Sequence, residues 1–153
     1  MTSRVVLVTG GNRGIGAAVA EAFVANGDRV AVLSRSGAAP TGTTGFACDV
    51  SDSSSVDAAF DAVEAQLGVA EVVVANAGIT KDTLLLRMTD DDLESVLNTN
   101  LTGSIRVARR AAKSMLRARK GRLIFMGSVV GLLGSAGLTL CALTREGRNI
   151  SLE

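Results

Sequence analysis

The sequence contains no histidine and no tyrosine, and its only cysteines are Cys48 and Cys141. Without histidine, neither a serine–histidine–aspartate triad nor a histidine-ligated metal site can form. The two cysteines are far apart and do not follow a metal-binding spacing, so we predict no metal site and expect a reduced, cytoplasmic protein. The missing tyrosine removes one of the side chains that deliver protons in enzyme active sites.

An excess of charge of either sign is also missing, because 16 basic and 15 acidic residues leave a formal net charge of +1. This balance gives no reason to expect a nucleic acid as a partner. A basic cluster occurs at residues 117–122, but it follows a long helical pattern, and we interpret it as a solvated helix end. The 153 residues, 47% of them apolar, suit one domain with a substantial core and are too few for two.

Long apolar segments are few. The run Val5–Val8 is too short for a signal peptide. Leu123–Leu143 contains no charged residue and approaches the length of a membrane span. Its six glycines and serines favour a buried strand followed by a loop, so we expect no membrane association.

Glycines gather in the segment Thr9–Gly16, which follows the apolar run Val5–Val8 and precedes the apolar run Ala17–Phe23. This context predicts a strand, a turn and a helix. Glycine lets the backbone turn tightly and approach a ligand, and the N–H groups of the first helical turn favour a phosphate. The spacing G-x-x-x-G-x-G differs from the common dinucleotide fingerprint and from the phosphate loop, so a plain glycine-rich turn is the alternative.

The order of the remaining elements predicts the fold. Further strands are expected at residues 29–34, 45–48, 71–75 and 122–126, and helices at 14–26, after N-cap candidates at 51–55, after Thr89 and after 98–103. Strands that alternate with helices pair in parallel through right-handed crossovers. We therefore predict an α/β fold, a Rossmann-type doubly wound parallel sheet in three α/β/α layers, with strand order 3-2-1-4-5 and the ligand at the strands' carboxyl ends.

Three motifs occur in the order typical of the short-chain dehydrogenase/reductase family. Thr9–Gly16 resembles its cofactor loop, Asn76-Ala77-Gly78 its second signature, and Phe125–Gly131 the strand end that carries its catalytic serine. Within the family, the chain most resembles the NADPH-dependent 3-oxoacyl-[acyl-carrier-protein] reductases, from about Arg4 to about Gly137. The resemblance implies an NADP(H)-binding domain at residues 1–137 and a divergent or truncated tail at 138–153.

The family has two further strands, and the resemblance therefore implies that the C-terminal strands are missing. The fifth strand would then be an exposed apolar edge, which favours aggregation or pairing with a partner. Three interpretations of the tail stay open: a truncated or frameshifted reading frame, a degenerate non-catalytic member, or an active variant that uses Cys141.

The resemblance also implies the cofactor contacts. Asp49 would contact the adenine ring, and the alternative is a helix N-cap. Arg35 follows the second strand, where NAD-binding members usually carry an acid, and it can bind a 2′-phosphate together with Arg13. We therefore expect NADPH rather than NADH. The alternative is that Arg13 and Arg35 are simply solvent-exposed and bind no phosphate. The expected cofactor-binding residues are Thr9, Gly10, Asn12, Arg13, Gly14, Ile15, Gly16, Arg35, Asp49, Val50, Asn76, Ala77 and Gly78.

By the same resemblance, Ser128 polarises the substrate carbonyl and Asn100 holds a water of the proton relay, with a bond to nearby backbone as the alternative for Asn100. The family's tyrosine is expected about thirteen residues after Ser128 and its lysine four residues later, where this chain has Cys141 and Arg145. The unperturbed pKa of a thiol, near 8.5, is suitable, but its side chain is shorter than a phenol. Arginine cannot relay a proton, although it could bind the ribose.

The expected function is NADPH-dependent reduction of a 3-oxoacyl group on acyl carrier protein, or of another small carbonyl substrate, impaired by the missing tyrosine and lysine. The alternative is a non-catalytic NADP(H)-binding or interaction module. A methyltransferase that binds S-adenosylmethionine is a weaker alternative, because it would need an acid in the place of Arg35. The resemblance also implies a homo-oligomer, a tetramer formed through the long helix.

Overall fold

The computed structural model describes residues 3–129, 141, 144 and 150–152. Strands and helices alternate along the chain. The strands are β1 (Val5–Thr9), β2 (Arg29–Ser34), β3 (Thr44–Ala47), β4 (Val72–Ala75), β5 (Gly121–Phe125) and β6 (Ile150–Leu152). The helices are α1 (Gly14–Ala25), α2 (Ser53–Leu67), the 3₁₀ turn η1 (Leu85–Arg87), α3 (Asp90–Val96), the π-helical turn η2 (Leu97–Thr102) and α4 (Gly103–Ala118).

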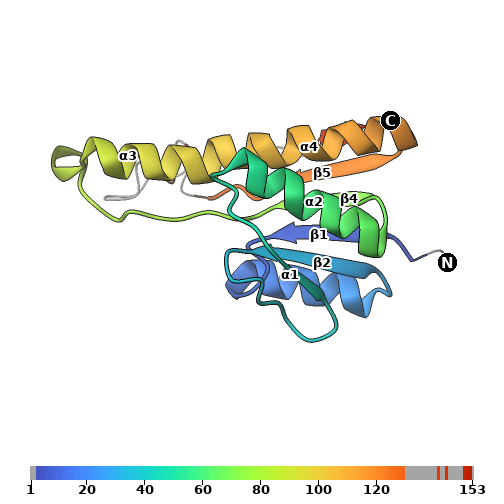
Figure 1. The fold of residues 1–153 in the computed structure, drawn as a ribbon. Helices are drawn as coiled ribbons and strands as arrows, with labels where there is room; N and C mark the ends of the chain where they lie inside the picture. Colours follow the sequence, from blue (N-terminus) through green and yellow to red (C-terminus); the bar gives the residue numbers. More distant parts are fainter. Residues whose placement is uncertain (1–2, 130–140, 142–143, 145–149, 153) are drawn as a thin grey trace.

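The sheet has the order β3-β2-β1-β4-β5-β6, and the first five of these strands are parallel (Figure 1). This order confirms the predicted 3-2-1-4-5 arrangement. The prediction that the fifth strand is an exposed edge is wrong, because β6 pairs antiparallel with it from Leu123↔Ile150 to Gly121↔Leu152. Pairing satisfies backbone N–H and C=O groups that would otherwise stay open at the edge. The proposed boundary between residues 137 and 138 lies outside the described residues.

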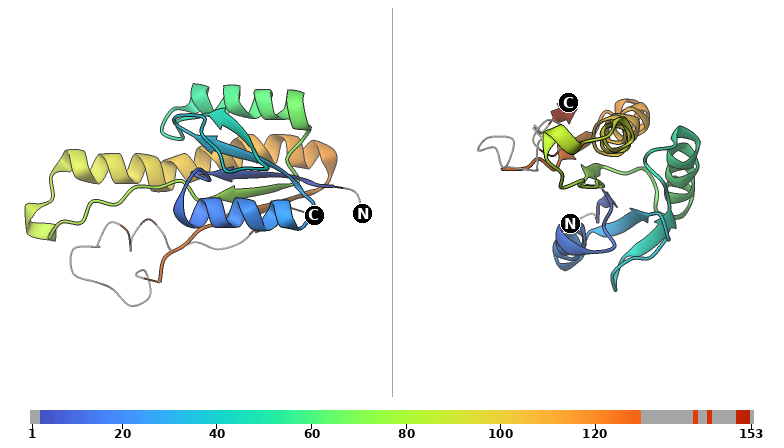
Figure 2. Two further views of the ribbon diagram at one scale, coloured as in Figure 1. Left: turned by 90° about the horizontal axis from the view of Figure 1, so that it is seen from below. Right: turned by 90° about the vertical axis from the view of Figure 1, so that its left-hand side faces the viewer.

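Helices cover both faces of the sheet, as the predicted three layers require (Figure 2). The strand residues alternate: Val5 and Leu7 pack with α2 and α4, whereas Val6 and Val8 pack with α1. Both faces are therefore apolar, which explains why these strands appear in the sequence as continuous apolar runs.

The segment from α3 to α4 is one long helical element that extends past the carboxyl ends of the strands (Figures 1 and 2). Thr89 begins it, as predicted, with a capping box in which its side chain accepts from the Asp92 N–H at 3.2 Å. The π-helical turn η2 joins α3 to α4, and such turns often occur at functional sites. No helix among the described residues is long and apolar enough to cross a membrane.

Candidate functional site

The glycine-rich loop connects β1 to α1 and uses backbone conformations that only glycine adopts readily. Gly10 and Gly14 have φ values of 64° and 55°. A Cβ on Gly10 would lie 2.9 Å from the Cα of Ala77. A Cβ on Gly16 would collide with the Asn76 amide and the Gly10 carbonyl. The loop therefore lies tightly against the end of β4.

Hydrogen bonds join this loop to the end of β4. The Thr9 hydroxyl accepts from the backbone N–H groups of Asn76 and Ala77, each at 3.0 Å. The Asn76 side-chain amide donates to the carbonyl oxygens of Thr9 at 3.0 Å and Gly10 at 3.2 Å. Thr9 itself is only 1% exposed, so its side chain holds the loop from the interior of the protein and does not face solvent.

A cleft of about 720 Å³ opens above the loop at the carboxyl edge of the sheet. Every residue predicted to bind the cofactor, except Thr9, lines it. Sequence reasoning missed seven further lining residues, most of them next to predicted ones; these are Leu33, Ser34, Ser36, Cys48, Ser51, Ile79 and Thr99. The N-terminus of α1 faces this space, which suits a ligand with phosphate groups.

Arg13 and Arg35 are exposed and line the cleft, so both can meet an anionic ligand. Asp49 lies nearby, and its carboxylate accepts from the Ser51 hydroxyl at 2.6 Å and the Ser51 N–H at 2.9 Å. These bonds, followed by the positive charges of Arg35 and Arg106, hold the pKa of Asp49 below its ordinary value. Asp49 is not the cap of α2, because Asp52 caps that helix.

Cys48 also lines the cleft, but it is only 5% exposed. Burial raises the pKa of its thiol to about 11. Cys48 is therefore a neutral, unreactive thiol at neutral pH.

Asn100 is buried in η2 and connects this turn to the loop after β4. Its Oδ1 accepts from the Ile79 N–H at 2.8 Å, and its Nδ2 donates to the Ile79 carbonyl at 3.0 Å. The same Nδ2 donates to the Thr144 hydroxyl at 3.2 Å. The side chain thus bonds to the backbone of a residue 21 positions away, and not to the neighbouring backbone considered as the alternative from the sequence. The proton-relay role of Asn100 stays a prediction.

Of the other predicted catalytic residues, the structure describes Ser128 and Cys141. Ser128 follows β5 at the carboxyl side of the sheet and is half-buried. Cys141 is a half-buried free thiol, and Thr144, three residues later, reaches Asn100. Arg145 lies outside the described residues.

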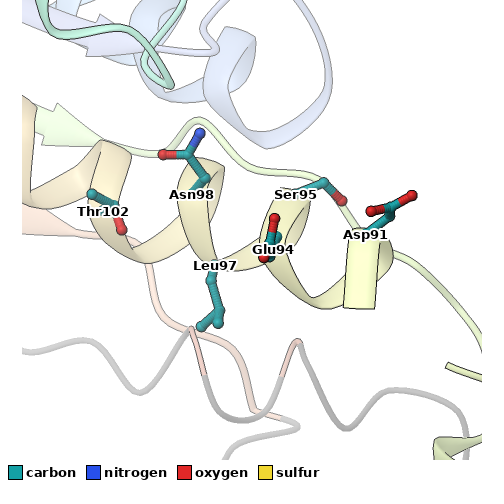
Figure 3. A pocket seen from close by; sticks show the side chains of 6 residues that line it. All are labelled: Asp91, Glu94, Ser95, Leu97, Asn98 and Thr102. Atoms are coloured by element: carbon teal, nitrogen blue, oxygen red, sulfur yellow. The ribbon is translucent and has the colours of Figure 1, made fainter. Parts of the chain in front are cut away.

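A second hollow, of about 540 Å³, lies on α3 and η2 (Figure 3). It is lined by Asp91, Glu94, Ser95, Leu97, Asn98 and Thr102. In the described part of the chain, no cluster of three or more His, Cys, Asp or Glu residues could hold a metal ion.

Five parallel strands with a glycine loop at their topological switch point define an α/β fold of the Rossmann class, in which this edge of the sheet is the usual place for a ligand. Residues 4–142 match the family model described as short chain dehydrogenase, and the chain belongs to that family.

Over 145 residues, the chain is 52% identical to the 3-oxoacyl-[acyl-carrier-protein] reductase MabA of Mycobacterium tuberculosis, covering 95% of this chain and 59% of the relative. It is 39% identical over 155 residues to the corresponding reductase FabG of Vibrio harveyi, covering 96% and 64%. A crystal structure of a short-chain dehydrogenase from Streptomyces avermitilis superposes with a TM-score of 0.86 at 30% identity, covering 94% of this chain and 55% of that one. The chain thus spans about three-fifths of the length of the curated relatives it matches.

Proposed function

We propose that the chain binds NADPH and acts in the reduction of a 3-oxoacyl group on acyl carrier protein to the 3-hydroxyacyl form. The observation that carries this proposal is the 52% identity to a reductase named for that substrate. The alternative, a non-catalytic NADP(H)-binding module, shares the same cleft and differs only in turnover.

The cleft has the features that this cofactor needs. Because Gly10 and Gly16 have no Cβ, the loop lies close against the end of β4. The open space beside Gly14 leaves room over the start of α1 for a pyrophosphate. Arg13 and Arg35 provide two positive charges for the 2′-phosphate that distinguishes NADPH from NADH. On this assignment, Asp49 and Val50 lie beside the adenine ring, and Asn76-Ala77-Gly78 runs along the nicotinamide ribose.

When bound, the nicotinamide supplies the hydride, and the protein supplies orientation and a proton. Ser128 is proposed to donate a hydrogen bond to the substrate carbonyl. The usual proton donor is missing, because the chain contains no tyrosine and Cys141 occupies the position expected for it. Arg145, in the place of the lysine, can bind a ribose hydroxyl but cannot pass on a proton. We expect turnover to be lower than in a tyrosine-containing reductase by ~100-fold or more.

Further parts of the proposal rest on family membership. We propose a homo-oligomer formed through the long helix, a cytoplasmic location, and a carbonyl substrate rather than a nucleic acid or a membrane as the partner. We also propose a division into an NADP(H)-binding domain at 1–137 and a divergent or truncated tail at 138–153.

The test is a fluorescence titration of the purified chain with NADPH and, separately, NADH, followed by a turnover assay with an acetoacetyl thioester of acyl carrier protein. Saturable binding that prefers NADPH, together with slow oxidation of NADPH by the thioester, would support the proposal. Binding without any turnover would favour the non-catalytic module. If folded protein binds neither nucleotide, the cofactor assignment is wrong.

A further inference from the structure

Arg106 connects the long helical element of η2 and α4 to the segment between β3 and α2, which lies more than fifty residues earlier in the chain. From α4, its Nε donates to the hydroxyl of Ser53, the first residue of α2, at 3.2 Å. Its Nη1 donates to the Asn98 side-chain oxygen in η2 at 2.8 Å and to the Asn98 carbonyl at 3.3 Å. The same Nη1 donates to the carbonyl of Val50 at 3.4 Å. One half-buried guanidinium thus joins η2, the start of α2 and the turn between β3 and α2.

The turn that Arg106 contacts forms one wall of the cleft. Asp49, Val50 and Ser51 all line the cleft, whereas Arg106 does not. The start of α4 lies directly behind this wall, because a Cβ on Gly103 would lie 3.0 Å from the Cγ2 of Val50 and 3.1 Å from its carbonyl oxygen. Arg106 therefore contacts the wall from the side opposite the ligand.

Val50 is buried and packs against Gly103, but the hydrogen bonds that the turn makes with itself are local. Asp49 bonds to Ser51, and the Asp49 N–H donates to the Ser55 hydroxyl at 2.9 Å. These contacts shape the turn but do not fix its distance from η2, whose Thr99 lines the cleft as well. Arg106 donates to Val50 and to Asn98 from the same nitrogen and so adds a polar link between the turn and η2 to the packing of Val50 against Gly103.

We infer that Arg106 is a positioning residue that shapes the adenosine side of the cleft and so raises the affinity for the adenosine half of the dinucleotide. The adenosine side is the one formed by the ends of β2 and β3, where Arg35 and Asp49 lie. This inference rests on the proposed binding of NADP(H). It predicts weaker binding without the loss of any group that touches the nucleotide.

The test uses 2′,5′-adenosine diphosphate as a probe, because this molecule represents the adenosine half with its 2′-phosphate and lacks the nicotinamide. Isothermal titration calorimetry would compare the intact chain with Arg106→Met and Arg106→Lys, at a temperature where circular dichroism shows each protein to be folded. Arg106→Met keeps an unbranched stem as far as the position of Nε but removes every donor, and we expect binding about tenfold weaker. Arg106→Lys keeps one charged donor and should recover part of the affinity.

Two variants on the same helix serve as controls. Arg109 is exposed, and Arg109→Met should bind the probe like the unsubstituted chain. Arg110 joins α4 to α2 through Asp61 and Glu64, away from the cleft-lining residues. Arg110→Met should therefore lower the melting temperature without changing the dissociation constant.

The outcomes separate the inference from the proposed function. If folded Arg106→Met binds the probe as tightly as the unsubstituted chain, the inference is wrong. Equal losses of affinity in Arg106→Met and Arg110→Met would also overturn it, because they would indicate a general effect on stability. If Arg106→Met does not fold, Arg106→Lys decides alone, and unchanged affinity there contradicts the inference. Failure of the unsubstituted folded chain to bind the probe would instead refute the proposed NADPH binding.

Discussion

The substitution Gly16→Ala tests the geometry of the glycine loop. The added methyl group would collide with the Asn76 side-chain amide and the Gly10 carbonyl. Crowding a packed position costs about 1–3 kcal/mol. Displacing the Asn76 amide also removes its two hydrogen bonds to Thr9 and Gly10, at about 0.5–1.5 kcal/mol each. We therefore expect a loss of about 2–6 kcal/mol in the free energy of unfolding and a displaced loop over the cleft.

The assay is an NADPH fluorescence titration combined with thermal unfolding. The matched control is Gly27→Ala, because Gly27 has a φ of 87° and no heavy atom within 4 Å of an added Cβ. Gly27→Ala should lose about 1–2 kcal/mol of stability from backbone strain alone and keep its affinity for NADPH. Gly16→Ala should bind NADPH at least ~10-fold more weakly while folded. Unchanged affinity and unchanged melting temperature in Gly16→Ala would refute the argument.

Three further predictions concern charge, pH and the buried amide. Arg35→Asp should weaken the binding of NADPH far more than that of NADH, because it puts a negative charge beside the 2′-phosphate; fluorescence titrations that show equal losses would remove Arg35 from that role. Asp28 accepts from Arg4 at 2.7 and 3.0 Å, and this hydrogen bonding lowers the pKa of Asp28 to about 2. The stability that the ionised Asp28 contributes is therefore present above its unfolded pKa of about 4 and disappears as the pH falls toward 2. In urea unfolding, the free energy of unfolding of Asp28→Asn should differ from that of the unsubstituted chain at pH 6. The two values should converge near pH 2. Asn100→Ala leaves the backbone N–H and carbonyl of Ile79 without their side-chain partner and should cost about 2–4 kcal/mol in urea unfolding. A loss below about 1 kcal/mol for Asn100→Ala would contradict this account of the Ile79 contacts.

Much of the fold could be predicted from local sequence. The bounds of β2, residues 29–34, were predicted without error, because a short apolar run between turn residues has few other solutions. Thr89 was identified as a helix cap from a hydroxyl followed by three acids. The order of the five parallel strands was expected from the doubly wound pattern of alternating strands and helices.

The candidate cleft was also largely predictable, since a glycine loop and the ends of parallel strands meet at one edge of the sheet. For one glycine the structure gives a further reason. The sequence indicated that the glycines let the loop approach a ligand, and the structure adds that a Cβ on Gly16 would collide with the Asn76 amide and the Gly10 carbonyl. Asn76 lies 60 positions after Gly16, and spacing along the chain does not predict a contact between residues so far apart.

By itself, the sequence determined the first five strands, the helices between them and the position of the glycine turn, because these depend on periodicity and on backbone preferences within a few residues. The tertiary structure alone decided that β6 covers the first residues of β5, that Asn100 bonds to Ile79, and that Arg106 connects the cleft wall to α4. Each of these contacts joins segments that are distant in the chain, and each hydrogen-bonding group could have met other partners. Only the packing of the helices on the sheet brings the particular pairs together.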